Sequence, residues 1–170
     1  WRVEHAQVLD ASLYDYFSKN IIPSVQPTHA TSDMYWVEDR LGEKRTKHAY
    51  AYKKLLDKAG ILPLGTDFPV EEVNPLLTFY AAVSRQDESG YPEGGFQSEN
   101  AISRKEALIG MTRSAAYANF EEEVKGSLEV GKYADFVIFD QDLMQIPIKE
   151  IPELNVDATY LDGKRVYSGK

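Results

Sequence analysis

The chain of 170 residues contains no cysteine. It can therefore form neither a disulfide framework nor a thiolate metal site or nucleophile, and any metal must be held by His, Asp or Glu. Long apolar runs are also absent, because charged residues interrupt each stretch well before the roughly 20 residues that a transmembrane helix needs. We therefore expect a soluble protein with no membrane span. Its compartment, cytoplasmic or exported, stays open.

Basic clusters are a third feature that the sequence lacks. The formal net charge is -8, and the 19 Lys and Arg residues are scattered along the chain. This charge is a poor match for a phosphate backbone, so we do not expect a nucleic-acid partner. An initiating Met is missing as well: the chain starts at Trp1, inside a predicted strand. We expect it to be part of a longer protein.

A repeated pattern fills the first half of the chain, where each of three short apolar segments precedes a helical stretch. Asp10 and Asn74 are predicted N-caps, and Gly60 is the predicted end of a helix over 46–60. Strand and helix in alternation predict parallel strands joined by right-handed crossovers. The three segments are "WRVEHAQ" (1–7), "IIPSVQPTH" (21–29) and "ILPLGTDFPV" (61–70).

The second half of the chain changes character. A loop over 86–100, rich in Gly, Pro and acidic residues, is either a surface excursion or an active-site lid. A capping box of Ser103 and Glu106 then predicts a helix. After Gly126 the pattern is β, with a hairpin turn expected at Asp162-Gly163. We therefore expect one domain over 1–125 and another over 126–170.

Three side chains that can carry chemistry, those of His5, His29 and Asp67, come at or just past the ends of the three apolar segments. In parallel strands these ends share one face, where barrels and open α/β sheets bind ligands. Each residue alone has an ordinary structural alternative, such as a hydrogen-bonded histidine or a turn cap. His48 is expected only as part of a helix face. The convergence of the other three predicts a metal-assisted site.

Several segments together strongly resemble the C-terminal part of the amidohydrolase superfamily. The closest branch is the amidohydrolase-3 type, which includes YtcJ-like and AepA-like proteins and N-substituted formamide deformylases. The resemblance covers nearly the whole chain, in order and with few gaps. It is carried by "RVEHAQ", "SVQPTHATSDMYW", "LGTDFPVEEVNPLLTFYAAVSRQ" and "KGSLEVGKYADFVIFD".

The resemblance implies an α/β fold made of about strands six to eight of a TIM-like hydrolase barrel, followed by C-terminal strands of a β-sandwich. It implies that His5 and Asp67 bind a divalent metal and that Asp67 is also the general base. His29 would contact the substrate. Histidine and carboxylate ligands suit zinc, with iron or manganese as alternatives.

Two hypotheses about function follow. In the first, the chain is the C-terminal fragment of a metal-dependent hydrolase that cleaves an amide or other C–N bond in a small amide or N-acyl substrate. The second makes it a non-catalytic binding or assembly module, a degenerate relative of the amidohydrolases. Because a full barrel needs ~250 residues, we expect the isolated chain to be inactive, to hold metal partly or not at all, and to self-associate through its exposed edges.

Overall fold

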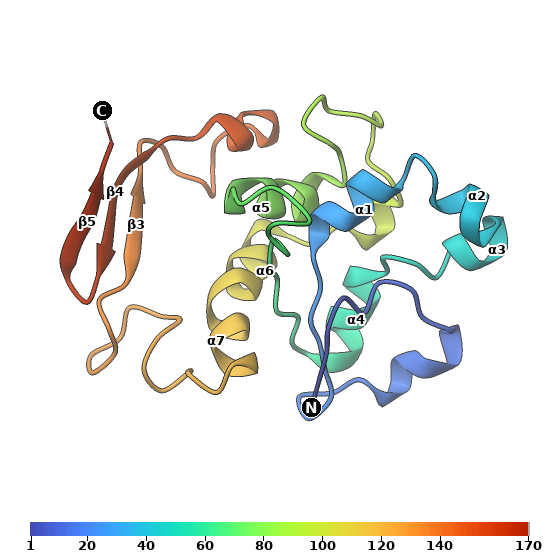
Figure 1. The fold of residues 1–170 in the computed structure, drawn as a ribbon, viewed down its shortest axis with the longest axis horizontal. Helices are drawn as coiled ribbons and strands as arrows, with labels where there is room; N and C mark the ends of the chain where they lie inside the picture. The colour runs from blue at the N-terminus through green and yellow to red at the C-terminus, as the bar shows by residue number, and fades with distance from the viewer. Residues whose placement is uncertain (170) are drawn as a thin grey trace.

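The molecule has a helical body and a small antiparallel sheet beside it (Figure 1). The structure is a computed structural model that describes residues 1–169. Its helices are η1 (Ala11–Tyr16), α1 (Pro27–Asp33), α2 (Val37–Leu41), α3 (Glu43–Thr46), α4 (Tyr52–Ala59), α5 (Pro75–Ser84), η2 (Ser98–Asn100), α6 (Arg104–Ile109), η3 (Gly110–Ser114), α7 (Ala115–Ala118) and η4 (Ile148–Glu153). Its strands are β1 (Arg2–Val3), β2 (Ile22–Pro23), β3 (Phe136–Phe139), β4 (Val156–Leu161) and β5 (Lys164–Ser168).

The three apolar segments of the first half lie side by side and run parallel, as predicted. β1 pairs with β2, and the third segment joins through a parallel bridge between Val25 and Leu64. The backbone N–H of Val25 donates to the carbonyl of Pro63 at 3.1 Å. Regular pairing is shorter than the sequence suggests, because Pro23 and Pro63 have no N–H to donate to a ladder. The carboxyl ends of the three segments nevertheless reach one edge.

Local capping signals produce the predicted helix starts. The Asp10 side chain caps η1, and the Asn74 side chain accepts a hydrogen bond from the Leu76 N–H at the start of α5. At the start of α6, Ser103 and Glu106 form a complete capping box. Each cap satisfies backbone N–H groups that have no partner within their own helix.

The predicted helix over 46–60 is wrong in its first part. α3 ends at Thr46 and α4 begins only at Tyr52, so that His48 lies in a turn and not on a helix face. Tyr50 has a positive φ of 54°, and its N–H donates to the carbonyl of Gln7 at 2.6 Å. This long-range contact breaks the helix. Gly60 ends α4 in the left-handed conformation, as predicted.

A turn over residues 34–36 separates the next two helices. α1 ends at Asp33, and α2 begins at Val37. α1 begins at Pro27, a residue type that suits the first helical turn.

A single helical rod covers the third parallel segment. α6, η3 and α7 follow one another without a break, and η3 is a turn of π-helix. Within that turn the carbonyl of Gly110 accepts a hydrogen bond from the Leu64 N–H at 3.1 Å. Gly110 is therefore a point of close approach between the rod and the segment that leads to Asp67.

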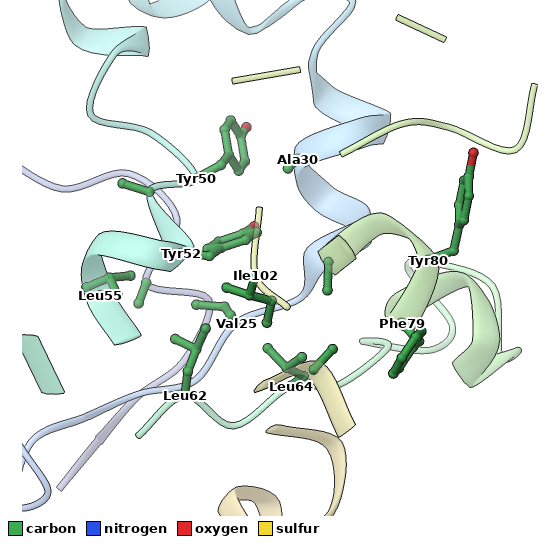
Figure 2. Packing of buried hydrophobic residues seen from close by; sticks show 14 of the residues in the cluster. Val25, Ala30, Tyr50, Tyr52, Leu55, Leu62, Leu64, Phe79, Tyr80 and Ile102 are labelled. Atoms are coloured by element: carbon green, nitrogen blue, oxygen red, sulfur yellow. The ribbon is translucent and has the colours of Figure 1, made fainter. Parts of the chain in front are cut away.

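The hydrophobic core lies between the parallel segments and the helices around them (Figure 2). Val25, Leu62 and Leu64 come from the segments, while Leu55 of α4 and Phe79 of α5 pack from the helices. All five side chains are buried. Burial of such side chains stabilises the body by about 1.5–3 kcal/mol each, and it fixes the segments whose ends carry the site.

The C-terminal sheet is antiparallel in the order β3-β4-β5, in agreement with the predicted β character of this region. Asp162 and Gly163, with φ of 49° and 72°, form the tight turn between β4 and β5. The rings of Phe136 and Tyr160 stack at 4.5 Å across β3 and β4. Within residues 1–169 no helix is both long and apolar enough to cross a bilayer.

Candidate metal centre

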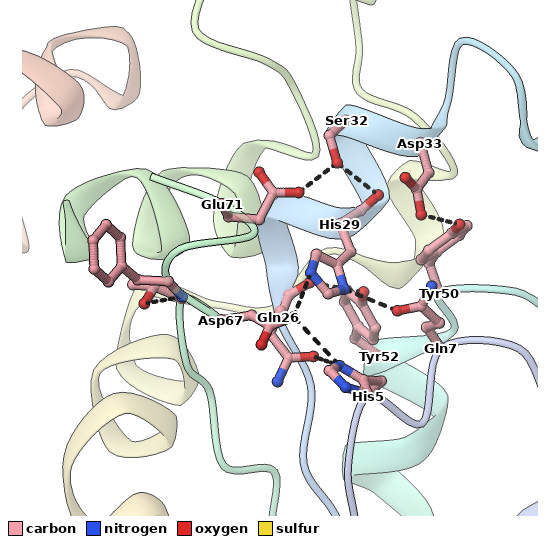
Figure 3. A network of polar contacts seen from close by, with 12 residues as sticks. His5, Gln7, Gln26, His29, Ser32, Asp33, Tyr50, Tyr52, Asp67 and Glu71 are labelled. Carbon is pink, nitrogen blue, oxygen red and sulfur yellow. Dashed lines mark hydrogen bonds and ion pairs between the residues drawn. The ribbon is translucent and has the colours of Figure 1, made fainter. Parts of the chain in front are cut away.

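His5, His29 and Asp67 meet at the carboxyl edge of the parallel segments (Figure 3). His5 follows β1 and Asp67 lies in the third segment beyond Leu64, while His29 is the third residue of α1, which begins shortly after β2. The expected convergence is therefore present, with the difference that His29 lies on a helix and not at a strand end.

The distances between the polar atoms are short. One carboxylate oxygen, Asp67 Oδ2, lies 3.3 Å from His29 Nε2 and 3.7 Å from His5 Nδ1. The two imidazole rings stack at 5.7 Å between centroids. The side chain of His29 is 9% exposed, that of Asp67 29% and that of His5 49%. One side of the cluster is thus closed by the protein, and the other is open to a solute.

The backbone at the site is strained. His5 and Asp67 have φ of 65° and 61°, and Ala6 has φ of 28°. A side chain disfavours this left-handed region, and each such residue costs about 1–3 kcal/mol. Strain of this kind persists where the surrounding structure enforces it, and it clusters at functional sites.

Two glutamines hold the histidines in a crossed arrangement that sequence reasoning missed. Gln26, which precedes α1, contacts Nδ1 of His5 through Oε1 at 3.0 Å. Gln7, two residues after His5, contacts Nδ1 of His29 through Oε1 at 2.8 Å. Each glutamine thus orients the histidine of the neighbouring segment. The only sequence signal was their proximity to the histidines, in "EHAQ" and "QPTH".

A buried arginine supports the segment that carries Gln26. Arg85 at the end of α5 is fully buried, and burial lowers the pKa of its guanidinium. Its Nε donates to the carbonyl of Phe96 at 2.9 Å, and its guanidinium lies 5.1 Å from the centroid of the Tyr52 ring. The Tyr52 hydroxyl in turn donates to the backbone carbonyl of Gln26 at 3.0 Å.

Further polar contacts position α1 next to the site. The Ser32 hydroxyl donates to Glu71 at 2.7 Å, and the Tyr50 hydroxyl donates to Asp33 at 2.6 Å (Figure 3). Burial, reinforced by the hydrogen bond to Asp33, raises the pKa of Tyr50. Tyr50 therefore stays neutral and keeps its proton for this bond.

The donor set fits a divalent metal of the zinc type. Zinc binds nitrogen and oxygen at about 2.0–2.2 Å, so neighbouring ligand atoms of a tetrahedral shell lie about 3.3–3.5 Å apart. The separation of 3.3 Å between Asp67 Oδ2 and His29 Nε2 matches this spacing, and one ligand atom from each of His5, His29 and Asp67 lies within 4.8 Å of the others. His29 Nε2 is buried and has no hydrogen-bond partner within residues 1–169. An unsatisfied buried group of this kind costs about 1–3 kcal/mol, which a bound cation would offset.

Comparison with known proteins identifies the family. Residues 2–167 match the family model described as the Amidohydrolase family. The chain belongs to this amidohydrolase family. The predicted resemblance is confirmed, and so is the α/β content of the fold.

Two curated relatives match nearly the whole chain. The chain is 38% identical to the protein LONG AFTER FAR-RED 3 of Arabidopsis thaliana and 32% identical to YtcJ of Bacillus subtilis (strain 168). Each match covers 98% of this chain, and it covers 28% and 32% of the respective relative. The chain thus spans about a third or less of the length of these curated relatives.

A solved structure agrees with the sequence comparison. The crystal structure of a metal-dependent hydrolase from Pyrococcus horikoshii OT3 is similar with a TM-score of 0.75 and 32% sequence identity. The similarity covers 86% of this chain and 30% of that chain. A divalent metal is therefore consistent with both the donor set and the structural neighbour.

Proposed function

We propose that this chain supplies part of the metal centre of an amidohydrolase that cleaves an amide or another C–N bond with a metal-activated water. The observation that carries the proposal is the meeting of His5, His29 and Asp67 at the carboxyl edge of three parallel segments, with one ligand atom of each within 4.8 Å of the others. In this proposal the segments are barrel strands six to eight within residues 1–125, and residues 126–170 contribute to a β-sandwich domain.

His5 and Asp67 are the residues proposed to hold the metal. A divalent metal lowers the pKa of bound water toward about 7 and polarises a carbonyl group. We assign the general base to Asp67. Its Oδ2 faces both histidines, which leaves Oδ1 to accept a proton from water and to return it to the leaving amine. The side chain is 29% exposed, so a small amide or N-acyl substrate can reach it.

The glutamines and the strained backbone orient the proposed ligand side chains in this mechanism. Gln26 holds the more exposed histidine, His5. The left-handed conformations of His5 and Asp67 turn both side chains toward the same point at the edge. Side chains that are already held in position favour catalysis, because a preorganised site need not reorganise during the reaction.

Metal content is the decisive measurement. The protein is expressed with its complete natural coding sequence and purified without chelators, and its metals are determined by plasma mass spectrometry. We expect near-stoichiometric zinc, with iron or manganese as alternatives. A His5→Asn variant should lose much of the metal, and Asn tolerates the left-handed backbone at this position. His48→Asn is the matched control, because His48 lies in a turn away from the cluster.

Activity follows as the second readout. A screen over amides and N-acyl compounds should reveal hydrolysis that Asp67→Asn abolishes without unfolding the protein. A wild-type protein that stays folded and metal-free would overturn the proposal and favour a non-catalytic binding or assembly module. The self-association expected of the isolated chain stays a prediction, to be measured by light scattering.

A further inference from the structure

We propose that His29 is a third metal ligand, which binds through Nε2, and that Gln7 selects this nitrogen by holding Nδ1. Sequence reasoning expected His29 to contact the substrate instead. The inference rests on the proposed metal centre and extends it, because it makes the ligand set of this chain two histidines and one aspartate.

The first step is the tautomer of His29. Nδ1 lies 2.8 Å from Oε1 of Gln7, and a carbonyl oxygen can only accept a hydrogen bond. Nδ1 therefore carries the hydrogen, and in the neutral imidazole Nε2 then has the free lone pair. That lone pair is on the side of the ring that faces Asp67 (Figure 3).

The second step is the direction of Nε2. It lies 3.3 Å from Asp67 Oδ2, yet it makes no hydrogen bond with any group in residues 1–169. A hydrogen on Nε2 would thus point past the carboxylate oxygen. In a tetrahedral zinc shell, likewise, the bond from a ligand atom to the zinc makes an angle of about 35° with the line from that atom to the next ligand atom. The ring is oriented as a ligand that shares a cation with Asp67.

The third step is burial. His29 is 7% exposed in all, and its Nε2 is buried. This leaves little surface for contact with a substrate, whereas His5 and Asp67 are both more open. A small ion can reach a buried nitrogen that a substrate group cannot.

The contact with Gln7 also fits a ligand. A histidine that binds a metal generally donates its other ring N–H to an oxygen acceptor, which fixes the tautomer and the ring orientation. Gln7 supplies this acceptor from the neighbouring segment. Gln7 is a positioning residue in this scheme, since it acts on the metal only through His29.

Cobalt(II) binding tests the inference without any assay of activity. The protein, with its complete natural coding sequence, is freed of metal by a chelator and titrated with cobalt chloride while its d–d absorption is recorded. We expect His29→Ala to weaken cobalt binding by at least about 10–100-fold and to change the absorption bands, as loss of a nitrogen ligand requires. His48→Ala is the matched control and should leave both unchanged.

Variants of Gln7 provide an independent readout. Gln7→Leu removes the acceptor and should weaken cobalt binding by about 10–100-fold. Gln7→Glu keeps an acceptor for the Nδ1 hydrogen and should restore most of the affinity. Thermal unfolding of the metal-free proteins shows whether each variant is folded. If His29→Ala does not fold, the Gln7 pair still decides the question.

The outcomes separate this inference from the proposed function. A wild-type protein that binds no cobalt refutes the metal centre itself. Wild-type affinity and an unchanged spectrum in His29→Ala refute only the assignment of His29, and the same holds if Gln7→Leu binds cobalt as tightly as Gln7→Glu. In that case Nε2 carries the hydrogen and His29 is a structural partner of Asp67.

Discussion

Substitution of Gly110 by alanine should destabilise the protein even though alanine is the better helix former. Gly110 has ordinary helical φ and ψ of -58° and -46°, so the backbone itself would accept alanine. A Cβ atom there, however, would lie 2.8 Å from the carbonyl oxygen of Leu62 and 2.7 Å from Cγ of Leu64. Because one of these atoms belongs to the backbone, the rod and the third parallel segment would have to separate.

The magnitude follows from three opposing contributions. Helix preference favours alanine by about 0.8–1.0 kcal/mol. Overpacking of a close contact costs about 1–3 kcal/mol, and weakening the hydrogen bond from the Leu64 N–H to the Gly110 carbonyl costs about 0.5–1.5 kcal/mol. The net loss is about 2 kcal/mol in the free energy of unfolding. The separation also moves the segment that carries Asp67, so metal affinity should fall as well.

Urea unfolding followed by circular dichroism measures the effect. With a slope of about 1–3 kcal/mol per molar urea, the midpoint should fall by about 1 M. The matched control is Gly65→Ala: an added Cβ meets nothing within 4 Å there, and φ is not positive. This control should be neutral or more stable by about 0.4–1 kcal/mol. Wild-type stability of Gly110→Ala, or an equal loss in Gly65→Ala, would refute the reasoning.

Two further predictions concern the helix caps. Asn74→Ala removes the side chain that accepts from the Leu76 N–H at 3.0 Å, and the urea midpoint should report a loss of about 1 kcal/mol, whereas Asn74→Asp should retain the cap. For Glu106, burial raises the pKa, but hydrogen bonds from Lys53 and Ser103 outweigh it and lower the pKa below 4.5. The ionised Glu106 side chain therefore stabilises the fold above the pKa it has in the unfolded chain. This stabilisation is lost as the pH falls through the pKa it has in the folded protein. The wild type should be more stable to unfolding than Glu106→Gln at neutral pH, and the difference should disappear in acid. A difference that does not change with pH would contradict this assignment.

Elements that depend on neighbouring residues were predictable from the sequence. The hairpin turn at Asp162-Gly163, the caps at Asn74 and Ser103, and the end of α4 at Gly60 all occur as expected. Each is decided within a few residues by backbone preference and local hydrogen bonds. The parallel alignment was also predictable, because strand and helix alternate.

Elements that depend on distant partners were not predictable. The helix expected over 46–60 breaks because the Tyr50 N–H bonds to Gln7, more than forty residues earlier in the chain. A periodic sequence contains no sign of such a contact. His48 was misplaced for the same reason, since its turn follows from the break.

The candidate site also has a part that was predictable from the sequence and a part that depends on distant partners. The sequence by itself determined which side chains gather, because His5, His29 and Asp67 each come at or just past the end of one of three apolar segments and parallel strands bring such ends to one edge. Only the tertiary structure decided how they face one another. The contacts of Gln7 with His29 and of Gln26 with His5 depend on the register of the two neighbouring segments. Packing sets this register, and local backbone preference does not.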